Sequence, residues 1–175
     1  MDFKKLYASL GRFSAWVGLS VCSLIVRVVP AACLYSFARG VAFLGYNFVR
    51  KQRRLALEGL GFAFGAEKSP QEKESIAREC FIDMSKSALE LMFMMDKPGL
   101  LKSAVSLGGR EHLDRALAKD KGVILVSAHF GNFPLLLSRL SQEGYRVAGI
   151  MRPMRDARVE RIFLAKRRRY GVKTI

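Results

Sequence analysis

Two long apolar runs stand near the amino terminus of this chain. The first covers residues 13–29 and the second covers residues 31–49, with Pro30 between them. A helix that crosses a bilayer needs about twenty apolar residues, so the first run is close to the minimum length. Arg27 interrupts this run near its end, where a long side chain can extend to the lipid headgroups. Residues 1–49 are therefore predicted to form a hydrophobic, membrane-associated helical segment.

This segment fits more than one arrangement. It can form a helical hairpin that dips into one leaflet, or a single crossing followed by an interfacial helix. A buried helical pair in a soluble bundle is the alternative without a membrane. No small-x-small cleavage site precedes a polar mature region, which argues against a signal peptide. Basic residues that favour anionic headgroups stand on both sides of the segment, and so indicate neither orientation. They are Lys4, Lys5, Arg12, Arg50, Lys51, Arg53 and Arg54.

The middle of the chain has the periodicity of helices. Residues 53–64 predict a helix that ends in a glycine turn. Ser69, Pro70 and Glu72 then predict a helix start, with a side-chain cap, a proline at the first position and an acidic residue in the first turn. The following helix is expected to continue to about Met95. Its apolar positions, which are expected to be buried, are Ile76, Cys80, Met84, Leu91 and Met94.

After this helical half, short apolar runs alternate with helical stretches. Residues 123–127 form an unbroken apolar run, as expected for a strand that is covered on both faces. Strands that alternate with helices pair in parallel through right-handed crossovers. The predicted strands are 104–107, 123–127, 146–151 and 172–175, and the predicted helices are 111–119, 133–143 and 158–170. The predicted fold class is α/β, with an N-terminal helical membrane-anchor part followed by a partial α/β sandwich around a mainly parallel sheet.

Composition narrows the range of partners. The chain has 30 Lys and Arg against 15 Asp and Glu, a formal net charge of +15. Such a surface attracts nucleic acid, an anionic membrane or phosphorylated ligands. The apolar runs favour the membrane, and the lack of a recognised motif argues against nucleic acid. Cys22, Cys33 and Cys80 lack metal-ligand spacing and are expected to be buried free thiols in a reducing compartment. No metal or cofactor is expected.

One histidine occupies a position typical of ligand-binding or catalytic residues. His129 follows the predicted strand 123–127, and ligands of open α/β sheets gather outside the carboxyl ends of the strands. Gly131 permits a close approach of backbone or substrate, and Asn132 is placed to cap the next helix, whose amides favour an anion. A histidine in this place can take a proton from a hydroxyl and start acyl transfer. Without such context, a histidine after a strand is more often structural than catalytic.

Four stretches of the sequence resemble one enzyme family. The stretch GVILVSAHFGNF resembles the signature of the bacterial lipid A biosynthesis acyltransferases, in which a strand ends in a histidine followed by Gly-Asn and an aromatic residue. RRLALEGLGFAFG is similar to the family's early basic helix, and SLGGREHLDRAL to the segment before the catalytic strand. GYRVAGIMRPMRDARVERIFLAKRRRYG is similar to its Arg-Pro block and the basic helix after it. The resemblance implies that residues 50–175 are the N-terminal portion of an acyltransferase-like α/β domain.

The resemblance also implies an activity. These enzymes transfer a fatty acyl chain from acyl carrier protein to a hydroxyl of a lipid A precursor or related glycolipid, at the cytoplasmic face of the inner membrane. His129 is then the general base, and Gly131 and Asn132 lie against the substrate. Arg152 and Arg155 match a basic pair that suits acceptor phosphates or the phosphopantetheine arm of the carrier. A solvated basic face is the alternative for these arginines and for the basic helix after them.

The sequence departs from the family at two points. Pro134 occupies the position, five residues after His129, at which the family has a carboxylate that orients the imidazole. Asp156 is the candidate replacement, with a helix N-cap as its alternative role. The chain is also shorter than family members, which indicates a C-terminal truncation. The competing hypothesis is a truncated or catalytically impaired membrane-bound relative that binds acyl carrier protein or anionic lipid without efficient turnover.

Overall fold

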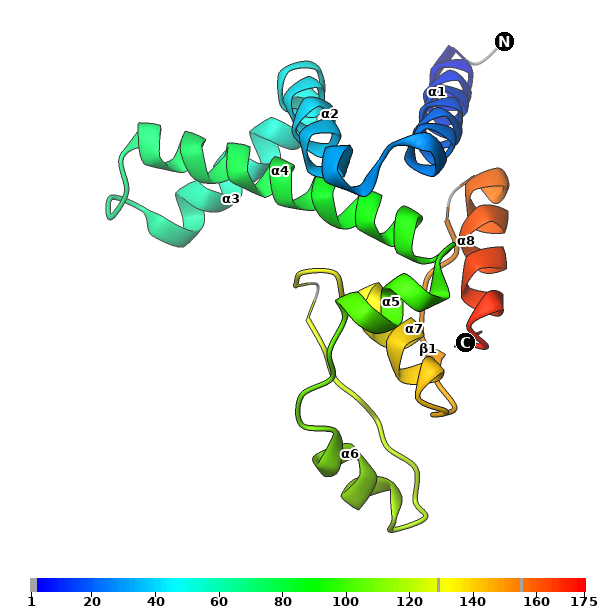
Figure 1. Cartoon of the computed structure of the whole chain (residues 1–175). Helices are drawn as coiled ribbons and strands as arrows, with labels where there is room; N and C mark the ends of the chain where they lie inside the picture. Colours follow the sequence, from blue (N-terminus) through cyan, green and yellow to red (C-terminus); the bar gives the residue numbers. More distant parts are fainter. Residues whose placement is uncertain (1–2, 129, 155) are drawn as a thin grey trace. The chain divides into compact units, whose positions relative to one another are not determined.

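Helices make up most of the chain, as Figure 1 shows. The computed structural model describes residues 3–128, 130–154 and 156–175, with the side chains of 3–8, 12, 15, 27 and 31 excepted. The chain divides into two compact units. One unit contains Ile25–Glu90, and the other combines Met1–Leu24 with Leu91–Ile175.

The first apolar run forms one long helix, α1 (Phe3–Val28). Within it, Ser9–Val26 has a mean hydropathy of 1.5 and is almost wholly unburied. In the described part of the chain, this is the one helix with the length and composition to cross a bilayer. The helix ends before Pro30, because proline disfavours helical backbone in the residue that precedes it. Membrane association itself stays a prediction.

The unit Ile25–Glu90 is built around one face of helix α2. This face buries one residue per turn at a constant spacing of four. The ring of Tyr46 packs edge-on against that of Phe81, with ring centroids 5.3 Å apart, and its hydroxyl donates to Glu74 Oε1 at 3.3 Å. The buried residues of α2 are Leu34, Ala38, Ala42 and Tyr46. The helices concerned are α2 (Leu34–Phe48), α3 (Arg50–Phe64) and α4 (Pro70–Met94), after a 3-10 turn at Ala31–Cys33.

The connection between α3 and α4 confirms the predicted helix boundaries. Gly65 ends α3 with a φ of +49°, a conformation that residues with a Cβ rarely adopt. Ser69 Oγ accepts a hydrogen bond from the Glu72 amide at 3.2 Å, and Glu72 Oε2 accepts one from the Ser69 amide at 2.8 Å. This reciprocal pair is a capping box, which fixes the start of α4. The hydrogen bonds from Ser69 also hold the pKa of the Glu72 carboxyl below its usual value.

The prediction of which α4 residues are buried is partly wrong. Cys80 and Met84 are exposed, Met84 with 72% of its surface accessible. Of the other predicted positions, all three are half-buried: Ile76, Leu91 and Met94. The buried hydrophobic positions are Ala77, Leu89, Met92 and Phe93. Periodicity identifies an apolar stripe on a helix, but neighbouring elements decide which part of a long stripe is covered.

The expectation that the cysteines are buried is also corrected. Cys33 and Cys80 are exposed free thiols. Cys22 is half-buried.

Short elements follow α4 in the unit that contains Leu91–Ile175. Strand β1 pairs in parallel with β2: the Lys173 amide donates to Val147 O and the Ile175 amide to Gly149 O, each at 3.0 Å. Helix α8 connects the two strands, which confirms parallel pairing through a helical crossover for this part of the sheet. The elements are α5 (Pro98–Ala104), α6 (Arg110–Leu117), α7 (Phe133–Gln142), β1 (Ala148–Gly149), α8 (Ala157–Arg169) and β2 (Lys173–Thr174).

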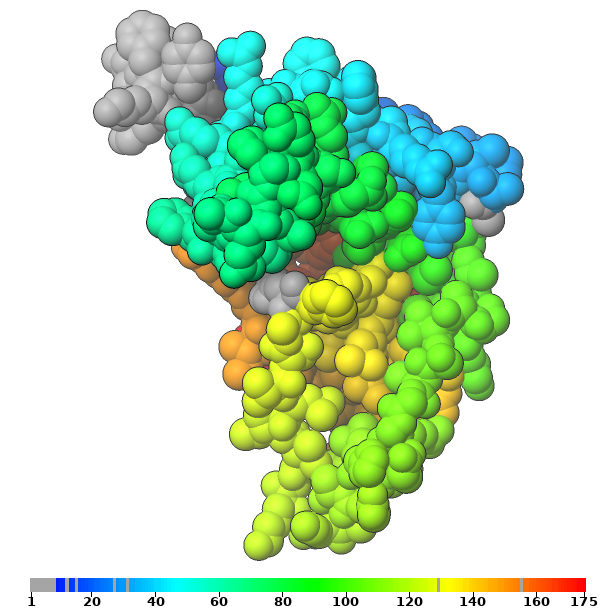
Figure 2. Space-filling model, turned by 90° about the vertical axis from the view of Figure 1, so that its left-hand side faces the viewer, coloured from blue at the N-terminus to red at the C-terminus, as the bar shows by residue number. Residues whose placement is uncertain are grey.

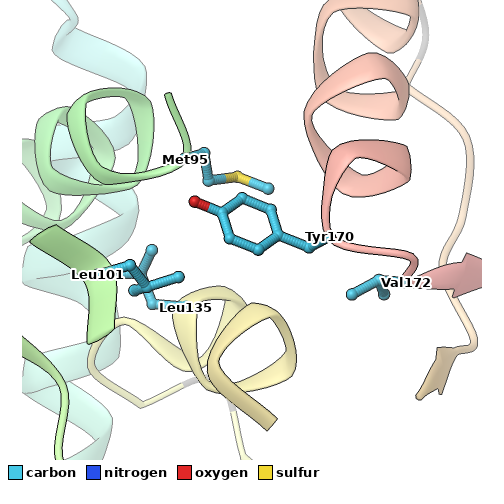
Figure 3. Packing of buried hydrophobic residues seen from close by; sticks show 5 residues of the cluster. All are labelled: Met95, Leu101, Leu135, Tyr170 and Val172. Atoms are coloured by element: carbon cyan, nitrogen blue, oxygen red, sulfur yellow. The ribbon is translucent and has the colours of Figure 1, made fainter. Parts of the chain in front are cut away.

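One apolar cluster holds these elements together. The ring of Tyr170, after the end of α8, points into the space between the end of α4 and helices α5 and α7 (Figure 3). Its hydroxyl donates to Met94 O at 3.0 Å, so the polar end of this buried side chain is satisfied. The cluster consists of Met95, Leu101, Leu135, Tyr170 and Val172. It therefore joins the end of α4 to the first turn of α7.

The predicted strand at residues 123–127 is not a strand in the structure. This segment has no regular secondary structure, and Ile124 and Val126 expose 92% and 93% of their surfaces. It lies open in yellow-green on the face in Figure 2. A strand needs hydrogen-bonded neighbours, and a doubly apolar strand also needs cover on both faces; the described residues supply neither. The predicted strand at 104–107 is wrong as well, because α5 extends to Ala104.

The described fold is thus mostly helical, with a two-stranded parallel sheet and one long apolar helix at the amino terminus. The wider α/β sandwich stays a prediction, as does a division into residues 1–49 and 50–175.

Candidate active site

The loop that precedes α7 carries the candidate site. Gly131 has a φ of +55°, and no heavy atom lies within 4 Å of where a Cβ would stand, so the backbone here is open to a ligand. Asn132 is the N-cap residue of α7 by position, although its side chain accepts no hydrogen bond from the first turn. Asn132 therefore occupies the predicted N-cap position, but its side chain does not cap the helix. His129, the predicted base, lies outside the described residues.

Pro134 lies in the first turn of α7, where the missing N–H has no acceptor within the helix to lose. It is half-buried. The position at which the family resemblance expects a carboxylate is thus part of a regular helix start. A glutamate at this position is compatible with the helix, because acidic residues are favourable near the positive end of the helix dipole.

Helix α7 is held in place by polar contacts that the sequence analysis missed. Arg139 is buried; its Nε donates to Val105 O at 2.8 Å and its Nη1 pairs with Glu143. Ser141 Oγ donates to the carbonyl oxygen of Tyr170. Arg139 also holds the pKa of the Glu143 carboxyl below its usual value. The spacing of four between Arg139 and Glu143 is typical of an ion pair on a helix, so this pair could have been predicted from the sequence.

The second half of the candidate site is the segment before α8. Arg152 is exposed and lies in a segment without regular secondary structure, and Arg155 is outside the described residues. Asp156 is the N-cap of α8: its Oδ1 accepts from the Arg158 amide at 2.9 Å. The Arg158 guanidinium also donates to both carboxylate oxygens of Asp156, at 3.0 Å and 2.7 Å. The N-cap role of Asp156 is confirmed, whereas its role as partner of His129 stays a prediction.

The contacts of Asp156 with Arg158 determine its ionisation. The bidentate hydrogen bond from Arg158 holds the pKa of the Asp156 carboxyl well below its usual range, so it is ionised at neutral pH. The same guanidinium lies over the rings of Phe13 and Trp16 in α1, 5.5 Å and 4.8 Å from their centroids. For the basic helix that contains Arg158, the sequence left both anion binding and a solvated basic face open. The structure places Arg158 between a carboxylate and two aromatic rings.

The basic run 166–169 is not a uniform anion-binding face. Lys166 is buried, and its Nζ donates to Asp96 Oδ2 at 2.7 Å. Arg167 pairs with Glu160 and is also used internally. Arg168 is exposed, and Arg169 is exposed but lies 3.5 Å from Asp96. One side of each turn of an amphipathic helix faces the protein, so a run of four basic residues places some of them against it, where they need internal partners.

Comparison with known proteins defines the class. A family model for bacterial lipid A biosynthesis acyltransferases matches residues 1–175, and the chain belongs to this family. It is similar to the lipid A biosynthesis palmitoleoyltransferase of Escherichia coli strain K12 and to the lipid A biosynthesis acyltransferase of Shigella flexneri. Each is 25% identical to it over 140 residues, which are 79% of this chain and 42% of the relative. The chain thus spans less than half the length of these relatives. No solved structure matches.

Proposed function

We propose that this chain takes part in the transfer of a fatty acyl chain from acyl carrier protein to a hydroxyl of a lipid A precursor or related glycolipid. The observation that carries the proposal is the family match over the whole chain, which includes the stretch of residues 122–133 with its histidine. In this proposal residues 50–175 are the N-terminal portion of an acyltransferase-like α/β domain. The reaction takes place at the cytoplasmic face of the inner membrane.

The proposed chemistry needs one base. The imidazole of His129 takes the proton of the acceptor hydroxyl while the oxygen attacks the thioester carbonyl. The new C–O bond forms, the C–S bond breaks, and the proton passes to the leaving thiolate. A thiolate is a good leaving group, so a strong acid is not required. The open space at Gly131 leaves the backbone before α7 accessible to the acceptor, and the amides of the first turn of α7 favour the acceptor's negative charge.

Arg152 and Arg155 are proposed to bind phosphate groups of the acceptor or of the carrier's phosphopantetheine arm. Arg168 is exposed on α8 and adds to the same positive surface. Arg158 and Arg167 are not included, because Asp156 and Glu160 already neutralise them.

A second candidate function rests on Pro134 and Asp156. Pro134 removes the expected carboxylate, and Asp156 is engaged by Arg158 through two side-chain hydrogen bonds. These observations favour a membrane-bound relative that binds acyl carrier protein or anionic lipid with weak turnover. An assay with acylated carrier and a radiolabelled lipid A precursor separates the two functions: both give binding of the carrier, but only the first gives transfer that Pro134→Glu raises.

The first prediction concerns the membrane. Because Ser9–Val26 is apolar and almost wholly unburied, the protein is expected to sediment with membranes and to need detergent for release. Sedimentation and carbonate or high-salt washing measure this. Recovery of most of the protein in the soluble fraction, or its release by high salt alone, would contradict the prediction.

The second prediction concerns the exposed arginines. Arg152→Ala and Arg168→Ala are each expected to weaken binding of acyl carrier protein about two- to fivefold at low salt, because exposed charge pairs contribute about 0.2–1 kcal/mol. The effect is expected to shrink at high salt. Lys119→Ala, which removes an exposed cation after α6, is the matched control and is expected to change nothing. Calorimetric titration at two salt concentrations measures the affinity of all three variants for acyl carrier protein. Affinities that change neither with salt nor with substitution would contradict the proposed role of these arginines.

A further inference from the structure

The unit Ile25–Glu90 contains a pocket that the proposed acyl transfer does not use. Its volume is about 440 Å³, within the range of pockets that hold small molecules. All of its lining residues belong to α2 and α4. They are Arg39, Gly40, Ala42, Phe43, Tyr46, Asn47, Arg78 and Ile82. None is a residue of the candidate active site, so the pocket is a separate feature of the molecule.

The pocket has the character of a site for a hydrocarbon chain. The surface that lines it is almost entirely apolar, so Arg39 and Arg78 contribute mainly their methylene stems to the walls. The side-chain nitrogen of Asn47 already has a partner within α2, because its Nδ2 donates to Phe43 O at 2.8 Å. Space at Gly40 is open, since no heavy atom lies within 4 Å of where its Cβ would stand. A linear apolar chain therefore meets an almost entirely apolar surface inside.

Positive charge gathers at the same place. The guanidinium of Arg78 lies 4.5 Å from the centroid of the Tyr46 ring, and that of Arg53 lies 5.0 Å from it. Arg78 also pairs with Glu74, with Nη2 and Oε1 2.8 Å apart. Arg39 is exposed and has no hydrogen bond or ion pair within the described part of the chain. Two guanidinium groups thus lie near the carboxylate of Glu74, and Arg39 adds a further positive charge at the pocket. The excess positive charge is complementary to an anion.

Large apolar side chains are exposed on α2 beside the pocket. On α2, Phe43 exposes 65% of its surface and Phe48 exposes 77%, and Leu44 is exposed as well. Large apolar side chains in this number are rarely left in water by a soluble protein. An apolar cavity that opens beside such a surface, with arginines at its margin, matches an amphiphile with one anionic group better than a wholly apolar or wholly polar ligand.

We propose that this pocket binds one acyl chain of an anionic phospholipid, with the phosphate held by Arg39, which no carboxylate neutralises within the described part of the chain. The acyl chain fills the space beside Gly40 and Phe43. The phosphate accepts hydrogen bonds from the guanidinium group, whose planar donors suit phosphate oxygens. The site does not depend on the transfer reaction and is expected to remain in a variant that lacks His129.

The test uses the full chain in neutral detergent and a phosphatidylglycerol with a photoreactive group at the end of one acyl chain. After irradiation, mass spectrometry is expected to find the label on peptides that contain residues 39–47 and 78–82. Labelling of α1 by lipid in the micelle is expected in every sample and is not the readout. Phosphatidylcholine with the same photoreactive chain is expected to label these peptides less.

Gly40→Leu is the variant that fills the pocket without removing a contact. The position is helical and its φ is not positive, and leucine is a better helix former than glycine, so the fold is expected to persist. Labelling of the pocket peptides is expected to fall at least about tenfold, since the leucine side chain excludes several methylene groups of the acyl chain from the pocket. Gly59→Leu is the matched control: Gly59 is also helical with open space around it, but lies on α3 outside the pocket. It is expected to label normally.

Arg39→Gln tests the anion. It is expected to lower labelling by phosphatidylglycerol about two- to fivefold at low salt, and to leave labelling by phosphatidylcholine unchanged. Equal labelling of Gly40→Leu and Gly59→Leu would show that the acyl chain does not bind in the pocket. Equal labelling by the two lipids would show that the site has no preference for an anionic headgroup. Complete protection by millimolar inorganic phosphate would show that the acyl chain contributes nothing, and would overturn the proposal as well. Each outcome is independent of the transfer assay.

Discussion

Replacing His129 with alanine is expected to abolish whatever acyl transfer this chain supports. General base catalysis contributes on the order of a hundredfold to ten-thousandfold in rate, and the stretch of residues 122–133 offers no second group that titrates near neutral pH. The measurement is transfer of a radiolabelled acyl chain from acyl carrier protein to a lipid A precursor, with membranes that contain the protein. The unsubstituted chain itself is expected to be slow, because Pro134 stands in place of the orienting carboxylate.

The chain contains a matched control for this substitution. Its other histidine, His112, is exposed on α6, where its Nδ1 lies 2.7 Å from an Arg115 guanidinium nitrogen. His112→Ala is expected to leave transfer unchanged. Transfer that survives His129→Ala would show that the base is misplaced.

Pro134→Glu is expected to raise the rate, since it restores a carboxylate at the first turn of α7, where an acidic residue is also favourable to the helix. If neither the unsubstituted chain nor Pro134→Glu transfers acyl groups while both bind acyl carrier protein, the binding-only function is the correct one. Efficient transfer by the unsubstituted chain would instead show that another group replaces the missing carboxylate. Asp156 is the first to test, with Asp156→Asn.

The second large effect is expected in the core beneath the candidate site. Leu135 in α7 is 4% exposed and packs in the cluster with Tyr170, whereas its neighbour Leu136 is 38% exposed. Leu135→Ala is expected to lower the free energy of unfolding by about 2–5 kcal/mol, because it removes buried methyl groups and leaves a cavity. Leu136→Ala makes the same chemical change one residue away and is expected to cost less than about 1 kcal/mol, since little apolar area is lost.

Unfolding by urea in detergent, followed by far-UV circular dichroism, compares the two variants. Because α7 begins directly after Asn132, Leu135→Ala is also expected to reduce any transfer activity, while Leu136→Ala leaves it near that of the unsubstituted chain. Equal destabilisation by the two substitutions would mean that the packing in Figure 3 does not hold in solution.

Much of the local structure follows from the sequence alone. The capping box at Ser69 and Glu72, the glycine end of α3 and the end of α1 before Pro30 all depend on residues within a few positions of each other. The resemblance that led to the family also lies in contiguous stretches, and the family match over residues 1–175 bears it out. Parallel pairing of β1 and β2 was predictable because the intervening helix dictates the direction of the second strand.

Other features were decided only by the tertiary structure. The apolar run 123–127 has the composition of a buried strand, yet its side chains are exposed, because a strand exists only where other segments supply hydrogen bonds and cover. Lys166 belongs to a basic run, yet it is buried against Asp96, seventy positions earlier in the chain. The sequence of a helix shows which residues share a face; the partner that meets that face comes from a distant segment. Burial and long-range ion pairs are therefore properties of the packed chain, whereas helix ends and the family motif are properties of its local sequence.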